Sequence, residues 1–404
     1  MGPYYPTAVR ILVISNMYPP HHYGGYELSC RDVVDRWRAA GHEVTVLTTT
    51  MRVPGVSTPD PGFVRRELSM YWDDHVLTSP PVWRRFAAER HNLRVLQRAL
   101  DEVRPDVVSV WNMGAMSLGL LTMLRRRSVP VVYVVCDDWM LYGGRLDAWA
   151  RLFGRRRRLG RLITFISGVP TEIGDLGAEG TFLFVSETTR QRAARRWQIP
   201  TSAVVHTGID HHDFPLTPPR SDPWRWRLLY VGRIDERKGI ATAVSALGLL
   251  PASATLTISG AGEESHRLDL VALASRLGVA DRIRWINVDR AALRDEYMQA
   301  DVFVFPSVWE EPFGLVPVEA MACATPVVAT GVGGSGEFLQ DGVNCLLFPA
   351  SDAAALAAAV TRLASSASLR ESLVAGGLRT AADLDIDHYA SVLAEWHATA
   401  AGDP

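Results

Sequence analysis

The sequence predicts an α/β protein built from two parallel sheets in tandem, each doubly wound by helices. Short runs rich in valine and isoleucine alternate with longer segments of helical periodicity, and this alternation occurs in two series. A length of 404 residues leaves room for two or three domains. The composition, 48% apolar and 21% charged, is that of a folded protein and excludes a disordered or collagen-like chain.

Each predicted strand is a short apolar run that stops at a polar or glycine-containing turn. The first series comprises residues 10–15, 43–48, 107–110, 131–135 and 182–185, and the second comprises residues 227–231, 254–259, 283–286, 302–305 and 327–330. Between the first two strands, residues 27–40 place apolar side chains at helical spacing, and Gly41 can end that helix.

Residues 214–223 separate the two series. Four prolines in this stretch remove backbone donors and prevent a helix from continuing, so we predict a first domain of residues 1–215 and a second that begins at residue 216. Ligands of doubly wound sheets bind beyond the carboxyl ends of the strands. The site is therefore expected between the two domains.

Charge and cysteine usage exclude several classes of protein. The 42 basic and 44 acidic side chains nearly cancel, which argues against nucleic acid as a partner. The four cysteines are far apart in the chain and suggest neither disulfides nor a zinc site. No apolar stretch is long enough for a transmembrane helix, and residues 1–6 lack the features of a secretory signal, so we expect a cytoplasmic protein.

The basic side chains are unevenly distributed. Residues 1–222 carry 28 basic and 22 acidic side chains, whereas residues 223–404 carry 14 and 22, which indicates two units with different partners. One segment places four consecutive arginines before several apolar residues: Arg155, Arg156, Arg157 and Arg158, then Leu159, Leu162, Ile163 and Phe165. It is either a basic amphipathic face in peripheral contact with anionic lipid at the inner membrane, or an ordinary solvated arginine run.

The chain contains a single lysine, Lys238, which follows a predicted strand together with Arg233. A guanidinium can hold two phosphate oxygens, and an ammonium acts as a compact point charge, so the pair suits a diphosphate. A surface ion pair with Asp235 or Glu236 is the alternative interpretation.

Glycine-containing turns follow other predicted strands, at Gly24 and Gly25, at residues 259–262 and at residues 331–334. Such turns either bring backbone N–H groups close to an anion or are plain turns. Two carboxylates, Glu311 and Glu319, follow the strand at 302–305. Because a carboxylate accepts two hydroxyl hydrogen bonds, this pair can hold a sugar at one end of a ligand and a ribose at the other. Acids near a helix start also simply complement the helix dipole.

Taken in order, these motifs resemble the retaining GT-B glycosyltransferases of family 4. The resemblance covers about residues 10–350 and rests on the Gly-Gly-x-Glu turn, the Gly-Arg-x-Asp-Glu-x-Lys-Gly segment, the Gly-Ala-Gly turn, the Glu-Pro-Phe-Gly-x4-Glu segment and the later Pro-Val-Val-Ala-Thr and Gly-Gly segments. It implies two Rossmann-like domains facing an interdomain cleft. The second, residues 216–384, would bind a nucleotide sugar, the first would bind the acceptor, and a carboxy-terminal helix, residues 385–404, would cross back to the first.

The resemblance also implies roles for individual residues. Arg233 and Lys238 would hold the diphosphate, Glu319 the ribose hydroxyls and Glu311 a hydroxyl of the donor sugar; Arg233, Lys238 and Glu311 are the implied catalytic residues. The other donor-binding residues that it implies are Gly24, Gly25, Gly232, Gly260, Val288, Phe313, Gly314 and Leu315.

One position departs from the family pattern. Cys136 stands where the family usually has a histidine that contacts the donor sugar, and a thiol is a poor hydrogen-bond donor. Either the sugar lacks a 6-hydroxyl, or Asp137 and Asp138 take over its recognition, or the alignment is shifted. Trp111 and Trp139 complete the candidate acceptor or sugar contacts, because aromatic rings stack on sugars, although core packing explains either tryptophan as well.

The implied reaction moves a sugar from a nucleoside-diphosphate sugar to an acceptor hydroxyl with retained configuration. In the implied front-face substitution, the leaving phosphate helps to deprotonate the acceptor. The acceptor is a small natural product, a glycan or a glycolipid, and no cofactor, metal or particular oligomeric state is implied. Two alternatives remain from other classes: a nucleotide-sugar epimerase of the same architecture and a non-catalytic sugar-binding protein.

Overall fold

A computed structural model describes residues 8–73, 76–220 and 223–402, which form two compact units. Unit 1 comprises Met1–His206 and Tyr389–Pro404, and unit 2 comprises Thr207–His388. The chain thus passes between units at 206/207 and 388/389, whereas the sequence places these passages at 215/216 and 384/385. Residues 1–6, discussed above for a secretory signal, and residues 221–222 of the proline-rich stretch lie outside the described residues.

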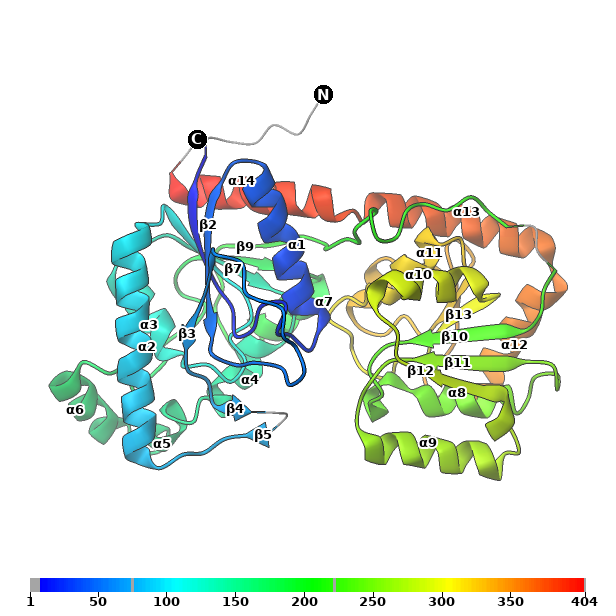
Figure 1. Ribbon diagram of the computed structural model, residues 1–404, viewed down its shortest axis with the longest axis horizontal. Coiled ribbons are helices and arrows are strands. Elements are labelled where there is room, and N and C mark those ends of the chain that lie inside the picture. The colour runs from blue at the N-terminus through cyan, green and yellow to red at the C-terminus, as the bar shows by residue number, and fades with distance from the viewer. Residues whose placement is uncertain (1–7, 74–75, 221–222, 403–404) are drawn as a thin grey trace. The chain divides into compact units, whose positions relative to one another are not determined.

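Unit 1 contains a seven-stranded sheet in which every pairing is parallel (Figure 1). Its order is β3-β2-β1-β6-β7-β8-β9, with the bounds β1 Arg10–Ile14, β2 Glu43–Thr49, β3 Val64–Leu68, β6 Val107–Val110, β7 Val131–Val135, β8 Thr181–Phe184 and β9 Ser202–Val204. The order reverses between β1 and β6, so this is a doubly wound sheet with its switch point there. A short antiparallel hairpin, β4 Trp72–Asp73 and β5 Val76–Leu77, stands apart.

Helices of unit 1 bury the sheet on two faces. They are α1 Gly25–Ala39, α2 Val82–Val103, α3 Gly119–Arg126, α4 Trp139–Leu146, α5 Ala150–Phe153, α6 Arg157–Ser167 and α7 Glu187–Ala194, joined by α14 Ile386–Ala401 from Tyr389 onward. Leu12 and Ile14 of β1 belong to a core cluster with residues of α2 and α3, and the intervening Val13 is equally buried. Because alternate strand residues face opposite ways, both faces of β1 are covered.

The terminal helix α14 is attached to unit 1 by specific contacts. The Trp37 indole of α1 donates to the carbonyl of Ala390 (2.9 Å), and its ring lies 4.7 Å from that of His397. All three residues are buried. In the parts of the chain that the structure describes, no helix is both long and apolar enough to cross a membrane.

Unit 2 repeats the design with a six-stranded parallel sheet of order β12-β11-β10-β13-β14-β15. The strands are β10 Arg227–Val231, β11 Thr255–Ser259, β12 Ile283–Ile286, β13 Val302–Phe305, β14 Val327–Ala329 and β15 Leu346–Leu347. The helices are α8 Ile240–Leu247, α9 Glu264–Arg276, α10 Arg290–Gln299, α11 Val316–Ala322, α12 Ala353–Ser365 and α13 Ala367–Asp383, with 3-10 turns at Glu236–Lys238, Ala280–Arg282 and Gly334–Glu337. The switch point lies between β10 and β13.

The predicted fold class is confirmed. All ten predicted strands are present, with ends that differ by at most one residue. Three strands of the two sheets, β3, β9 and β15, lie at the sheet edges and were not predicted. β3 has the sequence Val-Arg-Arg-Glu-Leu and is mostly half-buried, so it lacks the apolar run that marks an interior strand. β15 is only two residues long, shorter than the runs from which strands are predicted.

Two glycines fix the turns at the carboxyl end of β10. A Cβ on Gly239 (φ +65°) would lie 2.0 Å from the carbonyl oxygen of Pro306, and a Cβ on Gly260 (φ +149°) would lie 2.0 Å from that of Gly232. The turns after β10, β11 and β13 therefore pack backbone against backbone, which only glycine permits.

We predict that Gly239→Ala destabilises the protein more than Gly278→Ala. Gly278 has nearly the same backbone angle (φ +67°), but a Cβ there would meet no atom within 4 Å, so both variants carry the left-handed strain of about 1 to 2 kcal/mol. Only Gly239→Ala adds the overlap with Pro306, which costs about 1 to 3 kcal/mol more. Urea unfolding of both variants measures the difference in their free energies of unfolding. Equal unfolding midpoints would contradict the close packing of these turns.

Candidate active site

The switch point of unit 2 brings together the two predicted catalytic groups of opposite charge. Lys238 follows β10 and Glu311 follows β13, and the Lys238 Nζ lies 2.6 Å from the Glu311 Oε1 although the residues are 73 positions apart. Beyond the carboxyl ends of such strands lies the usual ligand position in a doubly wound sheet. This ion pair is the centre of the candidate site.

The Glu311 carboxylate is held on one oxygen only. The Ser307 hydroxyl donates to the same Oε1 (2.8 Å), and the backbone N–H of Gly334 donates to the Glu311 carbonyl (2.7 Å). Glu311 is 5% exposed. Among the described residues, none donates to its Oε2, so that oxygen can accept a hydroxyl from a ligand.

Arg233 lies at the same edge but is more exposed. Its side chain is 59% exposed, and its Nη2 lies 3.5 Å from the Asp235 Oδ2, a carboxylate that Arg237 binds more closely at 2.6 Å. The hydrogen bond from Arg237 holds the pKa of Asp235 well below its usual range. The sequence left open a surface ion pair with Asp235 as the alternative interpretation. Arg233 makes such a contact, although a long one, whereas Lys238 pairs with Glu311.

Glu319 occupies a second position, on α11, where it accepts a hydrogen bond from the Tyr297 hydroxyl (2.8 Å). Burial raises the pKa of this carboxyl, and the nearby guanidinium of Arg290 opposes the rise. Arg290 in turn lies 3.0 Å from the Asp213 carboxylate. Sequence reasoning assigned no role to Tyr297, Arg290 or Ser307, because each acts through side-chain contacts made only in the fold.

The remaining residues that were expected to bind the donor follow β13 and β12. Phe313 is 3% exposed and packs against Phe338, with ring centroids 5.0 Å apart. Gly314 adopts φ +88°, and Leu315 directly precedes α11. Val288 is half-buried beside Asp289, which caps α10 by accepting from the N–H of Ala292 (2.9 Å).

In unit 1 the glycine turn before α1 is closed by its own helix. The Gly24 N–H donates to the Glu27 Oε2 (3.0 Å), and the Asn112 side chain donates to the other Glu27 oxygen (3.3 Å). Burial raises the pKa of Glu27. Nothing lies within 4 Å of the Cβ position on Gly25, so this glycine is not required by packing. Asn112 was not predicted.

The segment after β7 contains the three polar candidates of unit 1. Cys136 Sγ lies 3.8 Å from the Tyr389 hydroxyl, and burial raises the pKa of the thiol to about 12. Asp137 accepts from the Tyr142 hydroxyl (2.5 Å) and from the Trp139 N–H (2.8 Å), and burial raises its pKa to about 7. Asp138 pairs with Arg192 at 2.5 Å.

The two tryptophans proposed as acceptor contacts are core residues in this structure. Trp111 and Trp139 are fully buried. The Trp111 indole donates to the Ser109 hydroxyl (2.9 Å), and Trp139 belongs to the core cluster of the sheet. Neither ring offers an exposed face for stacking on an acceptor, so both tryptophans pack in the core, as the second interpretation of the sequence had it.

Solved glycosyltransferases share this architecture. Sucrose-phosphate synthase from Thermosynechococcus elongatus matches with a TM-score of 0.72 at 22% identity, over 95% of this chain and 97% of that one. HepE of Anabaena, solved in complex with UDP-glucose, matches with a TM-score of 0.68 at 18% identity, over 96% of this chain and 98% of that one. The fold is that of the GT-B glycosyltransferases.

Sequence comparison defines the family. Residues 23–213 match the model for Glycosyltransferase Family 4, and residues 219–379 match that for Glycosyl transferases group 1. Glycogen synthase of Mycobacterium tuberculosis is 30% identical over 382 residues, 87% of this chain and 85% of that protein, and D-inositol 3-phosphate glycosyltransferase of an Arthrobacter species is 30% identical over 358 residues, 82% and 79%. The chain belongs to the family 4 glycosyltransferases, and the resemblance is confirmed.

We predict that Asp137→Asn removes a pH dependence of stability. The pKa of Asp137 is about 7 in the folded protein against an ordinary value of 3.8. Between these pH values the unfolded chain has lost this proton and the folded chain keeps it, so stability falls as pH rises from about 4 to about 7. Urea unfolding at several pH values should show the wild type losing about 2 to 4 kcal/mol more than the variant over this range.

Asp281→Asn is the matched control, because Asp281 is an exposed aspartate in the 3-10 turn before β12. This control should keep the wild-type pH profile. Parallel profiles for the wild type and Asp137→Asn would contradict the raised pKa of Asp137.

Proposed function

We propose that this glycosyltransferase takes a nucleoside-diphosphate sugar as donor and transfers the sugar with retained configuration to an acceptor hydroxyl. The Lys238–Glu311 pair carries this proposal. It places an ammonium and a carboxylate with one uncommitted oxygen at the switch point of the unit 2 sheet. The ammonium can bind a diphosphate, and the free carboxylate oxygen can accept a hydrogen bond from a sugar hydroxyl.

The charges of the turn after β10 support the donor class. An ammonium has three N–H donors, and Glu311 accepts from only one of those of Lys238, so the others can reach phosphate oxygens. The Arg233 guanidinium is exposed and only loosely paired, so it can turn toward the same phosphates. HepE of Anabaena, which shares this fold, was solved with UDP-glucose, and that observation favours a nucleotide sugar here.

The proposed reaction is a front-face substitution. The bond between the anomeric carbon and the phosphate oxygen breaks, and the nucleoside diphosphate leaves with the electron pair. The acceptor oxygen bonds to the same face of the carbon, and its proton passes to a leaving phosphate oxygen. Lys238 and Arg233 would stabilise the negative charge that develops on the diphosphate, as preorganised cations do at other reacting centres.

Glu311 and Glu319 would position the donor without bonding to it covalently. Lys238 and Ser307 hold the Glu311 carboxylate, which suits an acceptor of sugar hydroxyls better than a mobile nucleophile. Glu319 has one oxygen bound by Tyr297 and would use the other for a ribose hydroxyl. The scheme assigns charge neutralisation to the two cations and invokes no metal or cofactor.

The acceptor class is proposed more coarsely, as a hydroxyl of a small natural product, a glycan or a glycolipid. Unit 1 would bind it, and its polar cluster after β1, β6 and β7 includes Glu27, Asn112 and Asp137. The matched relatives carry names as different as glycogen synthase and D-inositol 3-phosphate glycosyltransferase, so the family alone does not select one acceptor.

The direct test is turnover with a panel of nucleoside-diphosphate sugars. The purified protein should release nucleoside diphosphate slowly with one donor alone and faster with a suitable acceptor, and the product's anomeric coupling constant should match that of the donor. An inverted product would overturn the mechanism. An isomerised donor sugar formed without an acceptor would instead indicate an epimerase.

Lys238→Gln should lower kcat by about one to three powers of ten, because it removes a cation that stabilises the leaving group. Arg276→Gln is the matched control, since Arg276 is exposed in the last turn of α9, and its kcat should equal that of the wild type. Urea unfolding of both variants checks that each is folded. Wild-type turnover by a folded Lys238→Gln protein would refute the assigned role.

A further inference from the structure

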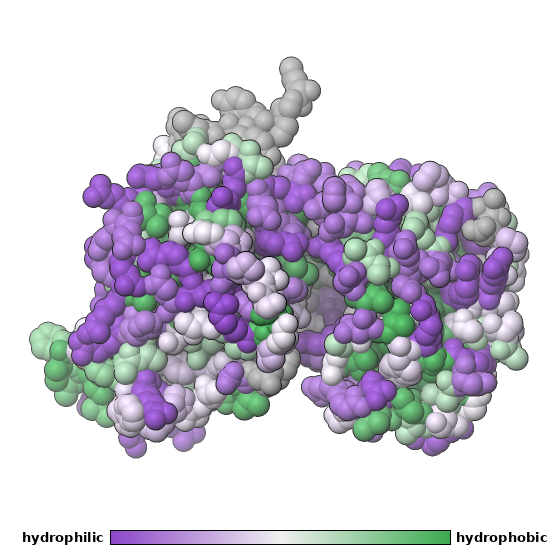
Figure 2. Space-filling model, viewed as in Figure 1, coloured by the Kyte–Doolittle hydropathy of each residue, from purple (hydrophilic) through white to green (hydrophobic). Residues whose placement is uncertain are grey.

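Helix α6 of unit 1 presents an apolar face that no other described part of the chain covers. Leu159, Leu162, Phe165 and Ile166 are 45%, 54%, 88% and 74% exposed. Their spacing of three and four residues places them on one side of the helix. Figure 2 shows apolar surface, drawn in green, at the left edge, where α6 lies in Figure 1. Proteins in water rarely expose so many large apolar side chains together unless they contact a partner or a membrane.

The opposite face of α6 is firmly packed, so the exposed face is held in place. Gly160 is buried, and a Cβ there would lie 2.7 Å from the Thr171 hydroxyl oxygen. The Thr164 hydroxyl lies 3.0 Å from that of Thr171, and Ile163 packs against the cluster that contains Phe153. The helix therefore stays attached to unit 1 while it displays the apolar side chains.

Four consecutive arginines precede this apolar face at the start of α6. Arg155, Arg156, Arg157 and Arg158 are all exposed. None of these four has an ion-pair partner among the described residues. Arg161 lies on the same helix and makes only a long contact, 3.4 Å, with Glu172. The segment thus combines uncompensated positive charge with exposed apolar surface, the combination found in helices that lie in a membrane interface.

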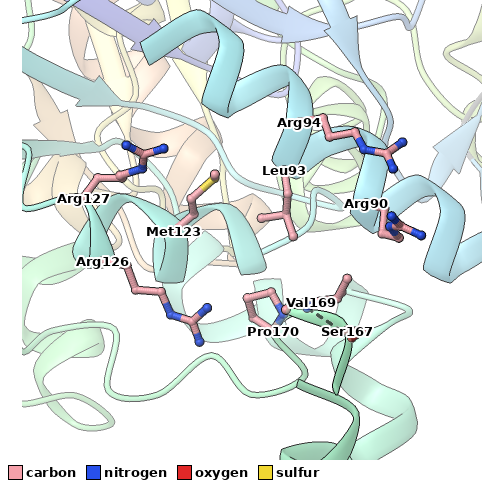
Figure 3. A pocket seen from close by; sticks show the side chains of 10 residues that line it. Arg90, Leu93, Arg94, Met123, Arg126, Arg127, Ser167, Val169 and Pro170 are labelled. Atoms are coloured by element: carbon pink, nitrogen blue, oxygen red, sulfur yellow. Dashed lines mark hydrogen bonds between the residues drawn. The ribbon is translucent and has the colours of Figure 1, made fainter. Parts of the chain in front are cut away.

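A basic pocket begins where α6 ends. It has a volume of about 310 Å³ and lies between α2, α3 and the residues after α6. Its floor contains Leu93, Met123 and Pro170, and its rim carries four arginines: Arg90, Arg94, Arg126 and Arg127. Figure 3 shows Arg90 and Arg94 on α2, Arg126 at the end of α3, and Arg127 directly after that helix.

The pocket's charge is available to a ligand. All four rim arginines are exposed. Arg127 donates to the Gln97 side chain and Arg90 lies over the Phe86 ring, but in the described chain no carboxylate pairs with any of the four. The pocket therefore favours an anionic group, and its apolar floor can accept the carbon atoms that adjoin such a group.

We propose that α6 and this pocket bind the surface of an anionic phospholipid bilayer. The apolar side chains of α6 would enter the boundary between headgroups and acyl chains, and the arginines of α6 and of the pocket would contact lipid phosphates. A bilayer fits better than a protein partner because exposed apolar side chains on α6 occur together with arginines that no described carboxylate pairs with, both at the start of α6 and in the pocket at its end. This role is separate from the donor chemistry of unit 2.

The test is co-sedimentation of the full chain with vesicles. The protein should bind vesicles of phosphatidylcholine containing phosphatidylglycerol, bind those of phosphatidylcholine alone far more weakly, and dissociate as salt is added. Replacing the four arginines at 155–158 by glutamine should weaken binding about a hundredfold or more, at about fivefold for each charge. Phe165→Ser with Ile166→Ser should weaken it about tenfold or more, because both lose their apolar insertion.

Matched controls come from exposed residues of unit 2. Leu268→Ser on α9 removes a 54% exposed apolar side chain, and Arg276→Gln with Arg379→Gln removes two exposed charges, and both should leave vesicle binding unchanged. Donor turnover in vesicle-free solution should be unchanged in the α6 variants, which separates this proposal from the one for unit 2. Equal binding to neutral and anionic vesicles, insensitivity to both α6 variants, or binding of inorganic phosphate without vesicle binding would each overturn it.

Discussion

The candidate site depends on one ion pair between residues that only the fold makes neighbours. Lys238 and Glu311 follow two strands that lie side by side at the switch point, and their side chains meet at 2.6 Å. A partly buried ion pair of this kind adds little to the free energy of unfolding, because the cost of desolvating both charges offsets much of their attraction. Its value is positional: the contact fixes where an ammonium and a carboxylate stand, and the Ser307 hydroxyl fixes the carboxylate further.

The surrounding backbone explains how this position is maintained. Gly239 lets the turn that carries Lys238 pack against Pro306, and Gly260 lets the turn after β11 pack against Gly232. The loops that carry the charges are thus fixed by backbone contacts before any ligand arrives, which is what preorganised electrostatic stabilisation requires. In unit 1 the equivalent turn is closed differently, since Glu27 engages the Gly24 N–H.

The sequence predicted the interior of each sheet well and the edges poorly. Interior strands such as Val131–Val135 are buried on both faces and read as continuous apolar runs, whereas β3 is half-buried and rich in arginine. Lys238 was recognisable because it is the chain's only lysine, and Glu311 because it lies in a motif. Ser307 and Tyr297 were not, since their roles arise from tertiary contacts. Core packing and contact with a sugar both remained open for Trp111 and Trp139, because the sequence does not reveal which way a ring faces, and both rings are buried.

Calorimetric titration of a nucleoside diphosphate and of its sugar conjugate into the wild type, Lys238→Gln and Glu311→Gln tests the central claim most directly. A thermal-shift panel first identifies the diphosphate that stabilises the wild type. We expect Lys238→Gln to weaken binding of that diphosphate by about tenfold to a hundredfold, the value of a charge-assisted hydrogen bond. We expect Glu311→Gln, whose amide oxygen can still accept from Lys238, to weaken diphosphate binding less than Lys238→Gln does and to lose the additional affinity that the attached sugar provides. Wild-type affinities for both ligands in a folded Lys238→Gln protein would contradict the account.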